Sequence, residues 1–320
     1  MLRLPALRLP VLPYVLPMVL SLSCAGPARA VESLPTDGAV VAGAAASPRH
    51  GALYRIRHDG HTGYLYGTIH VGQGDDTLMA PEAAHALATA SSVVVELDIR
   101  SSDAFQAALR KHGMYADGDS IVHHISPATL RQLVQALAGA GMTLREVERY
   151  KPWLIGNLLQ GLELDRNGYR RSGAAEYVLL AAAKQQDKTV RELESADYQL
   201  AIFDTLDAAQ QEQYLRENLA DLEDGKALQR SRDLIDAWRA ADTPRIDAAL
   251  HAFTAGSSIN ATFMQTILLG KRNPEMASAI ERILQQDQVS FVGVGLLHLA
   301  GANGLPQLLK QRGYVIEQLY

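Results

Sequence analysis

The sequence predicts an α/β domain in which a central mixed sheet, built from strands near both ends of the chain, is interrupted by a large, mostly helical insertion. Apolar runs typical of strands occur between residues 53 and 97 and again between residues 289 and 319. Between about residues 102 and 287, apolar residues recur mainly at helical spacing. No repeat of fixed period follows residue 50, which favours one α/β unit carrying an insertion.

The first thirty residues have the pattern of a secretory signal peptide. Arg3 and Arg8 precede an apolar stretch from Val11 to Leu22, and small residues lead to Ala30, after which we expect cleavage. The apolar stretch is too short to cross a membrane comfortably. We therefore expect a periplasmic or secreted protein. Cys24 follows a loose lipobox, so a lipoprotein anchored through Cys24 is the alternative, and membrane association is expected only in that case.

The mature chain is expected to begin with a flexible linker at residues 31–50, which are rich in Ala, Gly, Pro and Ser, followed by a domain over residues 51–320. Its first two strands flank Asp59-Gly60, a dipeptide typical of hairpin turns. Periodicity, with Gly and Pro at the ends, places the other elements. In order, we expect strands at 53–57 and 63–69, a helix at 81–90, a strand at 93–97, a possible strand at 189–193, a strand at 289–297, a helix at 305–311 and a strand at 314–319.

Charge and cysteine content exclude several classes of function. The 30 Lys and Arg residues against 35 Asp and Glu residues give a formal net charge of -5, so the chain has no basic surplus for a phosphate backbone and nucleic acid is not an expected partner. The single cysteine, Cys24, excludes a disulfide framework and a cysteine-ligated metal site. Any metal must therefore bind to His, Asp or Glu.

Two segments share the pattern Gly-x-x-His at the end of an expected strand. They are Gly67 to His70 and Gly295 to His298. A third polar residue, Glu96, ends the apolar run that begins at Val93. Ligands of open α/β sheets bind outside the carboxyl ends of the parallel strands, so we expect His70, Glu96 and His298 to share one pocket.

Two imidazoles and one carboxylate suffice to bind a divalent ion with open positions for water. Such a site fits manganese, cobalt, zinc or iron and is typical of metal-dependent hydrolases. A lone His at a strand end is more often structural, but a Glu is costly to bury there without a partner. Glu96 is therefore either a ligand or the base that takes a proton from water, and the sequence leaves both roles open.

Five separated segments of the chain also occur together, in this order, in a known family. They are Tyr64–Val71, Val94–Asp98, Lys151–Trp153, Arg272-Asn273 with Met276-Ala277 after it, and Phe291–Gly301. Over about residues 51–320 they resemble the TraB/GumN family, which includes the Tiki proteins, metal-dependent proteases with two GxxH motifs and a glutamate. The resemblance implies a hydrolytic α/β domain with His70, Glu96 and His298 at a divalent metal and with Arg272 and Asn273 nearby.

Two further acidic residues, Glu176 and Glu194, can be compared with segments of this family. Where the family commonly has Gly followed two residues later by Asp, this chain has Gly173-Ala174-Ala175-Glu176, so the carboxylate of Glu176 is displaced and on a longer side chain. Glu194 falls on a stretch that resembles the family's Leu-Glu segment. We expect Glu194 to support the site from behind the ligands rather than to bind the ion.

The sequence thus predicts an exported, metal-dependent hydrolase that cleaves peptide or protein substrates. Glu96, Arg272 and Asn273 are the expected catalytic residues, with Arg272 holding a carboxylate or a developing oxyanion. Two other classes stay open. One is a non-enzymatic envelope protein whose helical insertion binds a polymer or a partner, and the other is a carrier of metal or tetrapyrrole iron.

Overall fold

The computed structural model describes residues 49–98, 100 and 102–320. The expected signal peptide and Cys24 lie outside these residues, as does the expected linker up to residue 48. Two residues of that linker, Arg49 and His50, are described, and His50 is buried with its ring stacked 4.7 Å from that of Trp238. His50 therefore packs against the domain. No helix in the described part of the chain is long and apolar enough to span a membrane.

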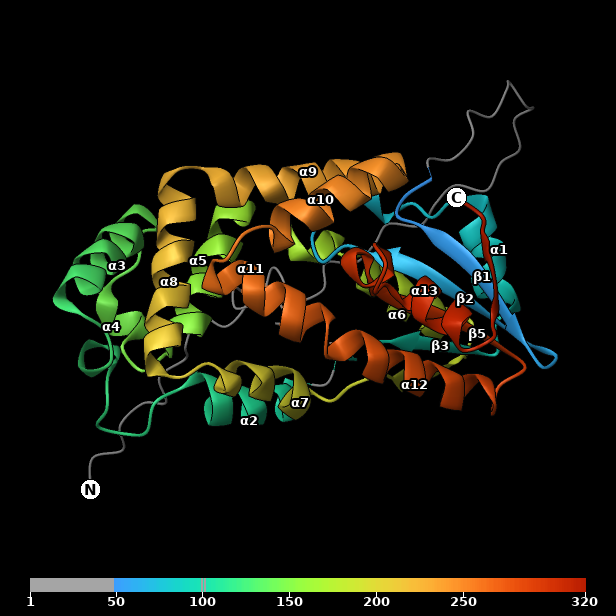
Figure 1. Cartoon of the computed structure of the whole chain (residues 1–320), viewed down its shortest axis with the longest axis horizontal. Helices are drawn as coiled ribbons and strands as arrows, with labels where there is room; N and C mark the ends of the chain where they lie inside the picture. Colours follow the sequence, from blue (N-terminus) through green and yellow to red (C-terminus); the bar gives the residue numbers. More distant parts are fainter. Residues whose placement is uncertain (1–48, 99, 101) are drawn as a thin grey trace.

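Six strands of the described residues form one mixed sheet at one end of the molecule (Figure 1). They are β1 (Leu53–His58), β2 (His61–Thr68), β3 (Ser92–Val95), β4 (Thr189–Glu192), β5 (Val289–Gly295) and β6 (Val315–Gln318). The order is β4-β3-β5-β2-β1-β6, with β4, β3, β5 and β2 parallel and β1 antiparallel to β2 and β6. The predicted fold class is confirmed, including the short strand within the insertion.

The hairpin that joins β1 and β2 turns at the predicted dipeptide. Asp59 and Gly60 have φ values of 47° and 82°. This is the left-handed conformation, which the tight hairpin turn requires at both of its central residues. Glycine adopts it without steric cost, and aspartate is one of the few other residues that tolerate it. A local dipeptide therefore sets the register from Leu53 opposite Tyr66 to His58 opposite His61.

Strand β5, the fifth of the six strands in sequence, lies in the middle of the sheet. It pairs in parallel with β2 on one side and with β3 on the other. In this register Thr68 lies opposite Gly295, and Val95 lies opposite Gly293. The carboxyl ends of three parallel strands, each followed by a candidate site residue, therefore lie side by side.

Most of the described chain outside the sheet is helical. The longer helices are α1 (Pro81–Thr89), α2 (Ser102–Gly113), α3 (Pro127–Gly139), α5 (Pro152–Arg166), α6 (Ala175–Gln185), α8 (Ala208–Glu223), α9 (Lys226–Ala240), α10 (Thr243–Thr254), α12 (Arg272–Leu284) and α13 (Leu305–Gln311). Shorter ones are α4 (Leu144–Val147), α7 (Ala196–Ala201) and α11 (Ile259–Phe263), the last continuing into a π-helical turn, Met264–Leu269. Short 3-10 helices are η2 (Gly74–Thr77), η3 (Ile121–His123), η4 (Arg171–Gly173), η5 (Ile202–Thr205) and η7 (Leu296–Leu299).

Helices cover both faces of the sheet. Because successive side chains of a strand point to opposite faces, Val93 and Val95 pack with α1 and α6, whereas Val94 packs in the core formed with α9, α12 and α13. Phe291 and Val292 on β5 divide between the faces in the same way. The inner strands are therefore buried on both sides, which explains their continuous apolar sequence.

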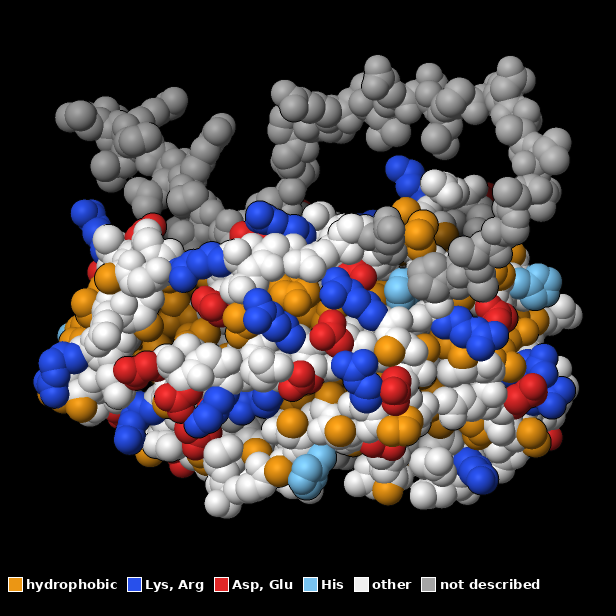
Figure 2. Space-filling model, turned by 90° about the horizontal axis from the view of Figure 1, so that it is seen from above, with side chains coloured by type: hydrophobic (Ala, Val, Ile, Leu, Met, Phe, Trp, Pro, Cys, Tyr) orange, Lys and Arg blue, Asp and Glu red, His pale blue; other side chains and the backbone are white. Residues whose placement is uncertain are grey.

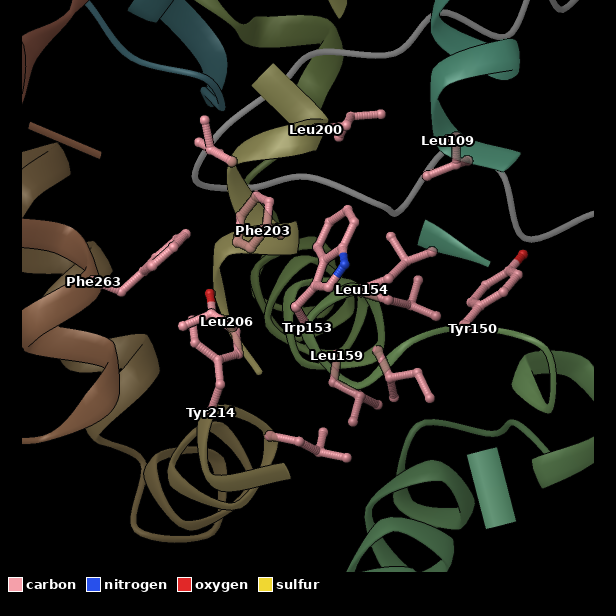
Figure 3. Packing of buried hydrophobic residues seen from close by; sticks show 14 of the residues in the cluster. Leu109, Tyr150, Trp153, Leu154, Leu159, Leu200, Phe203, Leu206, Tyr214 and Phe263 are labelled. Atoms are coloured by element: carbon pink, nitrogen blue, oxygen red, sulfur yellow. The ribbon is translucent and has the colours of Figure 1, made fainter. Parts of the chain in front are cut away.

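The helical insertion has a hydrophobic core of its own (Figure 3). Trp153 on α5 is fully buried, and its ring stacks on Phe203 at 4.1 Å with 9° between the planes. Phe263 packs against Phe203 with 5.0 Å between the ring centroids, and the ring of Tyr214 lies edge-on to that of Phe203. The same cluster includes Leu268 and Leu269 of the π-helical turn. The insertion thus has a packed core of its own, while its helices α6 and α12 contact the sheet.

Helix α9 holds the loop that follows β2. The indole Nε1 of Trp238 donates to the carbonyl oxygen of Gly67 at 2.8 Å. The next residue, Arg239, donates from Nε and Nη2 to the two carboxylate oxygens of Asp76 at 2.7 and 2.6 Å. These contacts lie before and after His70 in the sequence. They therefore fix both ends of the segment that carries His70.

The surface seen from above, on the side of α9 and α10, is mixed in charge. Figure 2 shows acidic and basic side chains interspersed over this face. This is consistent with a formal net charge of only -5 over 320 residues. Interspersed charges of opposite sign largely cancel beyond about one Debye length, roughly 10 Å at moderate salt.

We predict that the Asp76–Arg239 pair stabilises the fold in a pH-dependent manner. Burial opposes ionisation of Asp76, but the hydrogen bonds from Arg239 and from the Gln73 amide lower its pKa below the usual value. Its contribution is therefore present above the unfolded-state pKa of about 3.9 and is lost as the pH falls through the lower folded-state value. Asp76→Asn should reduce the free energy of unfolding by about 1–2 kcal/mol at pH 7.

Urea denaturation at pH 7 and near pH 3 checks this prediction, with Asp233→Asn on the exposed face of α9 as the matched control. The control should differ from the wild type by less than about 0.5 kcal/mol. A loss in Asp76→Asn that is equally large at both pH values would contradict the assignment.

Candidate functional site

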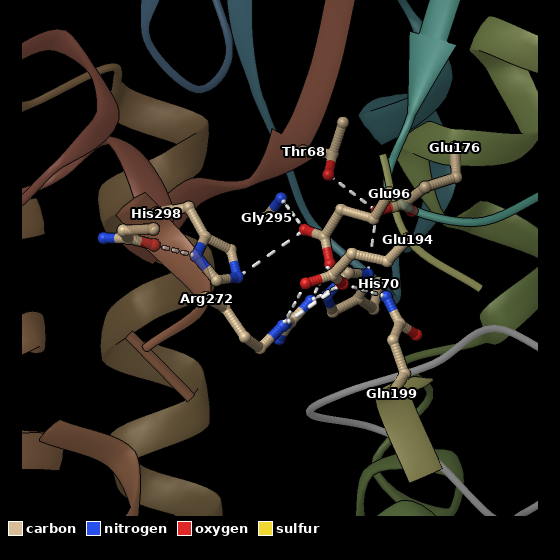
Figure 4. Close-up of polar contacts among 10 residues, drawn as sticks. Thr68, His70, Glu96, Glu176, Glu194, Gln199, Arg272, Gly295 and His298 are labelled. Atoms are coloured by element: carbon tan, nitrogen blue, oxygen red, sulfur yellow. Dashed lines mark hydrogen bonds and ion pairs between the residues drawn. The ribbon is translucent and has the colours of Figure 1, made fainter. Parts of the chain in front are cut away.

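The residues that follow the four parallel strands gather at one edge of the sheet (Figure 4). His70 follows β2, Glu96 follows β3, Glu194 follows β4 and His298 follows β5. Gly295 lies at the centre of this group, because a Cβ atom built on it would lie 3.3 Å from His70 Nε2, 3.3 Å from Glu96 Oε1 and 3.6 Å from His298 Cδ2. The structure thus brings His70, Glu96 and His298 together, and glycine leaves the space between them open.

The carboxylate of Glu96 is held by two donors. Its Oε1 accepts from the amide of Gly295 at 2.6 Å, and its Oε2 accepts from Arg272 Nη2 at 2.7 Å. The same Oε1 lies 3.7 Å from His298 Nε2. Burial favours the neutral acid, but the nearby His298, Arg272 and His70 and the Gly295 amide lower the pKa of Glu96 to about 2. Glu96 is therefore an ionised carboxylate at neutral pH.

Arg272, the first residue of α12, is only 2% exposed and joins two glutamates. Its Nε and Nη2 donate to Glu194 at 2.9 and 2.7 Å, and Nη2 also donates to Glu96. Burial opposes the charge, but both carboxylates raise the pKa of Arg272. Gln199 Nε2 donates to Glu194 at 2.7 Å. Glu194 thus supports the site from behind, and these donors of Arg272 are committed to carboxylates of the protein rather than directed at a substrate.

His298 is oriented by an amide side chain. Its Nδ1 lies 2.5 Å from Asn273 Oδ1, while Asn273 Nδ2 donates to the carbonyl oxygen of Asn303 at 2.8 Å. Because the Asn273 nitrogen is used by Asn303, its oxygen faces the ring, so the proton of His298 is assigned to Nδ1 and the lone pair to Nε2. Burial lowers the pKa of His298 to about 4. His298 is therefore a neutral imidazole whose Nε2 faces Glu96.

His70 is oriented by a carboxylate instead. Its Nδ1 lies 2.7 Å from Glu176 Oε1, an oxygen that also accepts from the hydroxyl of Thr68 at 2.6 Å. Burial opposes protonation, but the charge and hydrogen bonding of Glu176 raise the pKa of His70 above its usual value. The opposite ring nitrogen, Nε2, is the atom beside Gly295. Both histidines thus use Nδ1 for an outer partner and present Nε2 to the same space.

Close packing of two glycines brings Glu176 to His70. A Cβ on Gly72 would lie 2.3 Å from the carbonyl oxygen of Gly173, so no side chain fits there. Gly72 and Arg170 also exchange two backbone hydrogen bonds of 2.9 Å. The loop after His70 therefore lies directly against the start of α6, and Glu176 reaches the ring although its position departs from the family pattern.

The described residues of the site include the types of donor that a divalent ion requires, but these are not arranged around one point. Among the described residues, no three His, Asp or Glu side chains form a ready set of ligands around one point. The chemistry of the donors fits an ion: a ligating histidine typically has its second nitrogen bonded to a carboxylate or carbonyl oxygen, as in His70 and His298. Two carboxylates, Glu96 and Glu194, pair with the guanidinium of Arg272, and a third, Glu176, lies against His70, so the carboxylates at the site outnumber this guanidinium.

Several polar partners of the site were missed by sequence reasoning. Thr68 lies inside the first GxxH motif, where only its position beside the glycine hinted at a role. Gln199 and Asn303 have no recognisable local pattern, because each acts through one hydrogen bond to a residue distant in sequence. Asn273 was expected beside the site and contacts it through His298.

Fold and site together define an α/β protein with two histidines and a glutamate at the carboxyl edge of its parallel strands. The chain belongs to the TraB/PrgY/gumN family, whose sequence model matches residues 52–318. It is 28% identical over 258 residues to the uncharacterized protein YbaP of Escherichia coli strain K12, covering 77% of this chain and 87% of YbaP. YbaP of Shigella flexneri matches equally well. No solved structure matches the chain.

We predict that Arg272 is essential for stability, because it neutralises two buried glutamates. Arg272→Met should lower the free energy of unfolding by about 3–5 kcal/mol, since it leaves buried charges without a partner. Removing one of those charges as well, in Arg272→Met with Glu194→Gln, should recover part of the loss.

Urea denaturation of both variants tests this, with Arg282→Met at an exposed position of α12 as the control. If the double variant is less stable than Arg272→Met alone, uncompensated charge is not the cause of the loss.

Proposed function

We propose that this protein is an exported, metal-dependent hydrolase that cleaves peptide or protein substrates, with His70, Glu96 and His298 holding the ion. The observation that carries the proposal is the orientation of the two histidines. Each has Nδ1 close to a side-chain oxygen, while Nε2 of His70 lies beside Gly295 and Nε2 of His298 faces Glu96. This is the arrangement expected of imidazole ligands. Such donors fit manganese, cobalt, zinc or iron.

The residues around the space between the two histidines have different roles in the proposed hydrolysis. A bound divalent ion would polarise the carbonyl group of a substrate and lower the pKa of a water molecule. Glu96, ionised and beside His298, is placed either to ligate or to accept a proton from that water. Arg272 and the Gly295 amide hold the Glu96 carboxylate in one orientation. Glu176 and Asn273 orient the two rings, so Arg272 and Asn273 act as positioning residues.

Export is supported by the sequence of residues 1–30. Their basic start, apolar stretch and small residues before Ala30 fit a cleaved signal peptide, which would direct the protein to the periplasm or outside the cell. Lipid attachment at Cys24 is the alternative, and it would add a membrane anchor to the same domain.

Metal binding should depend on both histidines. We expect the purified mature protein to bind one divalent ion, and His70→Ala and His298→Ala each to lose it, since one of three ligands is then missing. Elemental analysis after dialysis measures the ratio of metal to protein. His85→Ala on the exposed face of α1 is the matched control and should retain the ion, and equal metal content in all four proteins would contradict the assignment.

Activity should depend on Glu96. In a digest of an unbiased peptide library with added divalent ions, Glu96→Gln should cleave at least about 100-fold more slowly than the wild type, whether its carboxylate serves as base or as ligand. Circular dichroism confirms that the variant is folded, and Glu223→Gln at the end of α8 is the exposed control. Equal cleavage by Glu96→Gln and wild type would show that Glu96 is structural.

A further inference from the structure

A small cavity of about 70 Å³ lies directly beside the histidines. His70, His298 and Arg272 form its polar end. The remainder is lined mainly by aliphatic and thioether side chains, among them Leu234, Met264, Leu268 and Leu269. The cavity is therefore continuous with the proposed site and differs from it in polarity.

Three side chains of the apolar part come from the π-helical turn Met264–Leu269. The Gly270 amide donates to the carbonyl oxygen of Gln265 at 3.0 Å, which is the five-residue spacing of a π-helix. This spacing directs Met264, Leu268 and Leu269 to the cavity. A Cβ on Gly270 would lie 2.7 Å from the Gln265 oxygen, so glycine is required where the turn passes into α12. Turns of this type occur frequently at functional sites.

The lining excludes charged occupants. Arg272 is already paired with Glu96 and Glu194, so it offers no free charge to an acidic side chain. The apolar part carries no acid that could neutralise a basic side chain, and an unpaired charge is costly to bury. An aliphatic group is stabilised there, because its apolar surface is removed from water.

The volume limits the size of the occupant. A water molecule in the liquid occupies about 30 Å³, so about 70 Å³ corresponds to roughly two waters or a few methyl-sized groups. An apolar cavity that binds benzene has about 150 Å³, roughly twice this volume. The space therefore suits valine, leucine or isoleucine and is too small for an aromatic side chain.

We infer that this cavity is the specificity pocket of the enzyme and that it accepts the aliphatic side chain of the substrate residue adjoining the cleaved bond. The inference rests on the proposed function, because it takes the bond to be cleaved at the histidines and Glu96. It assigns substrate selection to the π-helical turn and to Leu234 on α9.

Positional cleavage profiles test the pocket. In the wild type, peptides with Val, Leu or Ile at one position adjoining the cleaved bond should react at least about 10-fold faster, in kcat/KM, than those with Phe, Lys or Glu. Leu268→Ala should enlarge the pocket and raise the relative kcat/KM for Phe by about 10-fold, whereas Leu234→Phe should fill it and favour Ala or Gly. Leu219→Ala, at an equally buried leucine of α8, should leave the profile unchanged.

A binding measurement separates failure of the inference from failure of the proposed function. We expect N-acetyl-leucinamide, but not N-acetyl-lysinamide, to shift the methyl NMR signal of ¹³C-labelled Met264, and Leu234→Phe to abolish the shift. Cleavage with an identical profile in Leu268→Ala and Leu234→Phe overturns the inference and leaves hydrolysis standing. Absence of cleavage with every metal overturns the proposed function. If N-acetyl-leucinamide then also fails to shift the Met264 methyl signal, the assignment of the pocket is overturned as well.

Discussion

Burial of charge at the edge of the sheet is the constraint that organises the site. Carboxylates removed from water are stable only when donors and positive charge face them, and Arg272 supplies both. Its guanidinium joins residues that follow β3 and β4, while the amide of Gly295 binds the other oxygen of Glu96 at the end of β5. One cation therefore links two strand ends to the start of α12, and Glu96 links them to a third strand end through the Gly295 amide. The geometry of the space between the histidines follows from that arrangement.

The two histidines are similar in sequence but differ in their electrostatic surroundings. His70 is backed by the carboxylate of Glu176, which favours its protonated form, whereas His298 is backed by the neutral amide of Asn273 and is kept unprotonated by burial. A carboxylate behind an imidazole also makes the opposite nitrogen a stronger electron donor. The repeated GxxH motif thus produces two groups with distinct chemistry, because their partners come from different helices, α6 and α12.

Local sequence patterns predicted the features of the fold that depend on residues close together in the sequence. Asp59-Gly60 predicted the hairpin, and apolar runs ending in His70, Glu96 and His298 predicted that these residues lie at strand ends. The order of the strands was not predictable in the same way, because the insertion of β5 between β2 and β3 depends on pairing between distant segments. The contact of Glu176 with His70 also escaped prediction, since it follows from backbone packing of glycines far apart in the chain. The π-helical turn has an apolar pattern that an ordinary helix would share.

The central position of β5 also has a consequence for the kinetics of folding. During synthesis the hairpin of β1 and β2 can form early, but neither β2 nor β3 gains its inner neighbour until the C-terminal segment has been made. Such long-range pairing gives a high contact order, which slows folding because a long loop must close before the contacts form. The histidine ends of the two GxxH strands are then assembled in one of the last steps. A nascent chain of this topology has no complete sheet, and so no assembled site, until its final strands arrive.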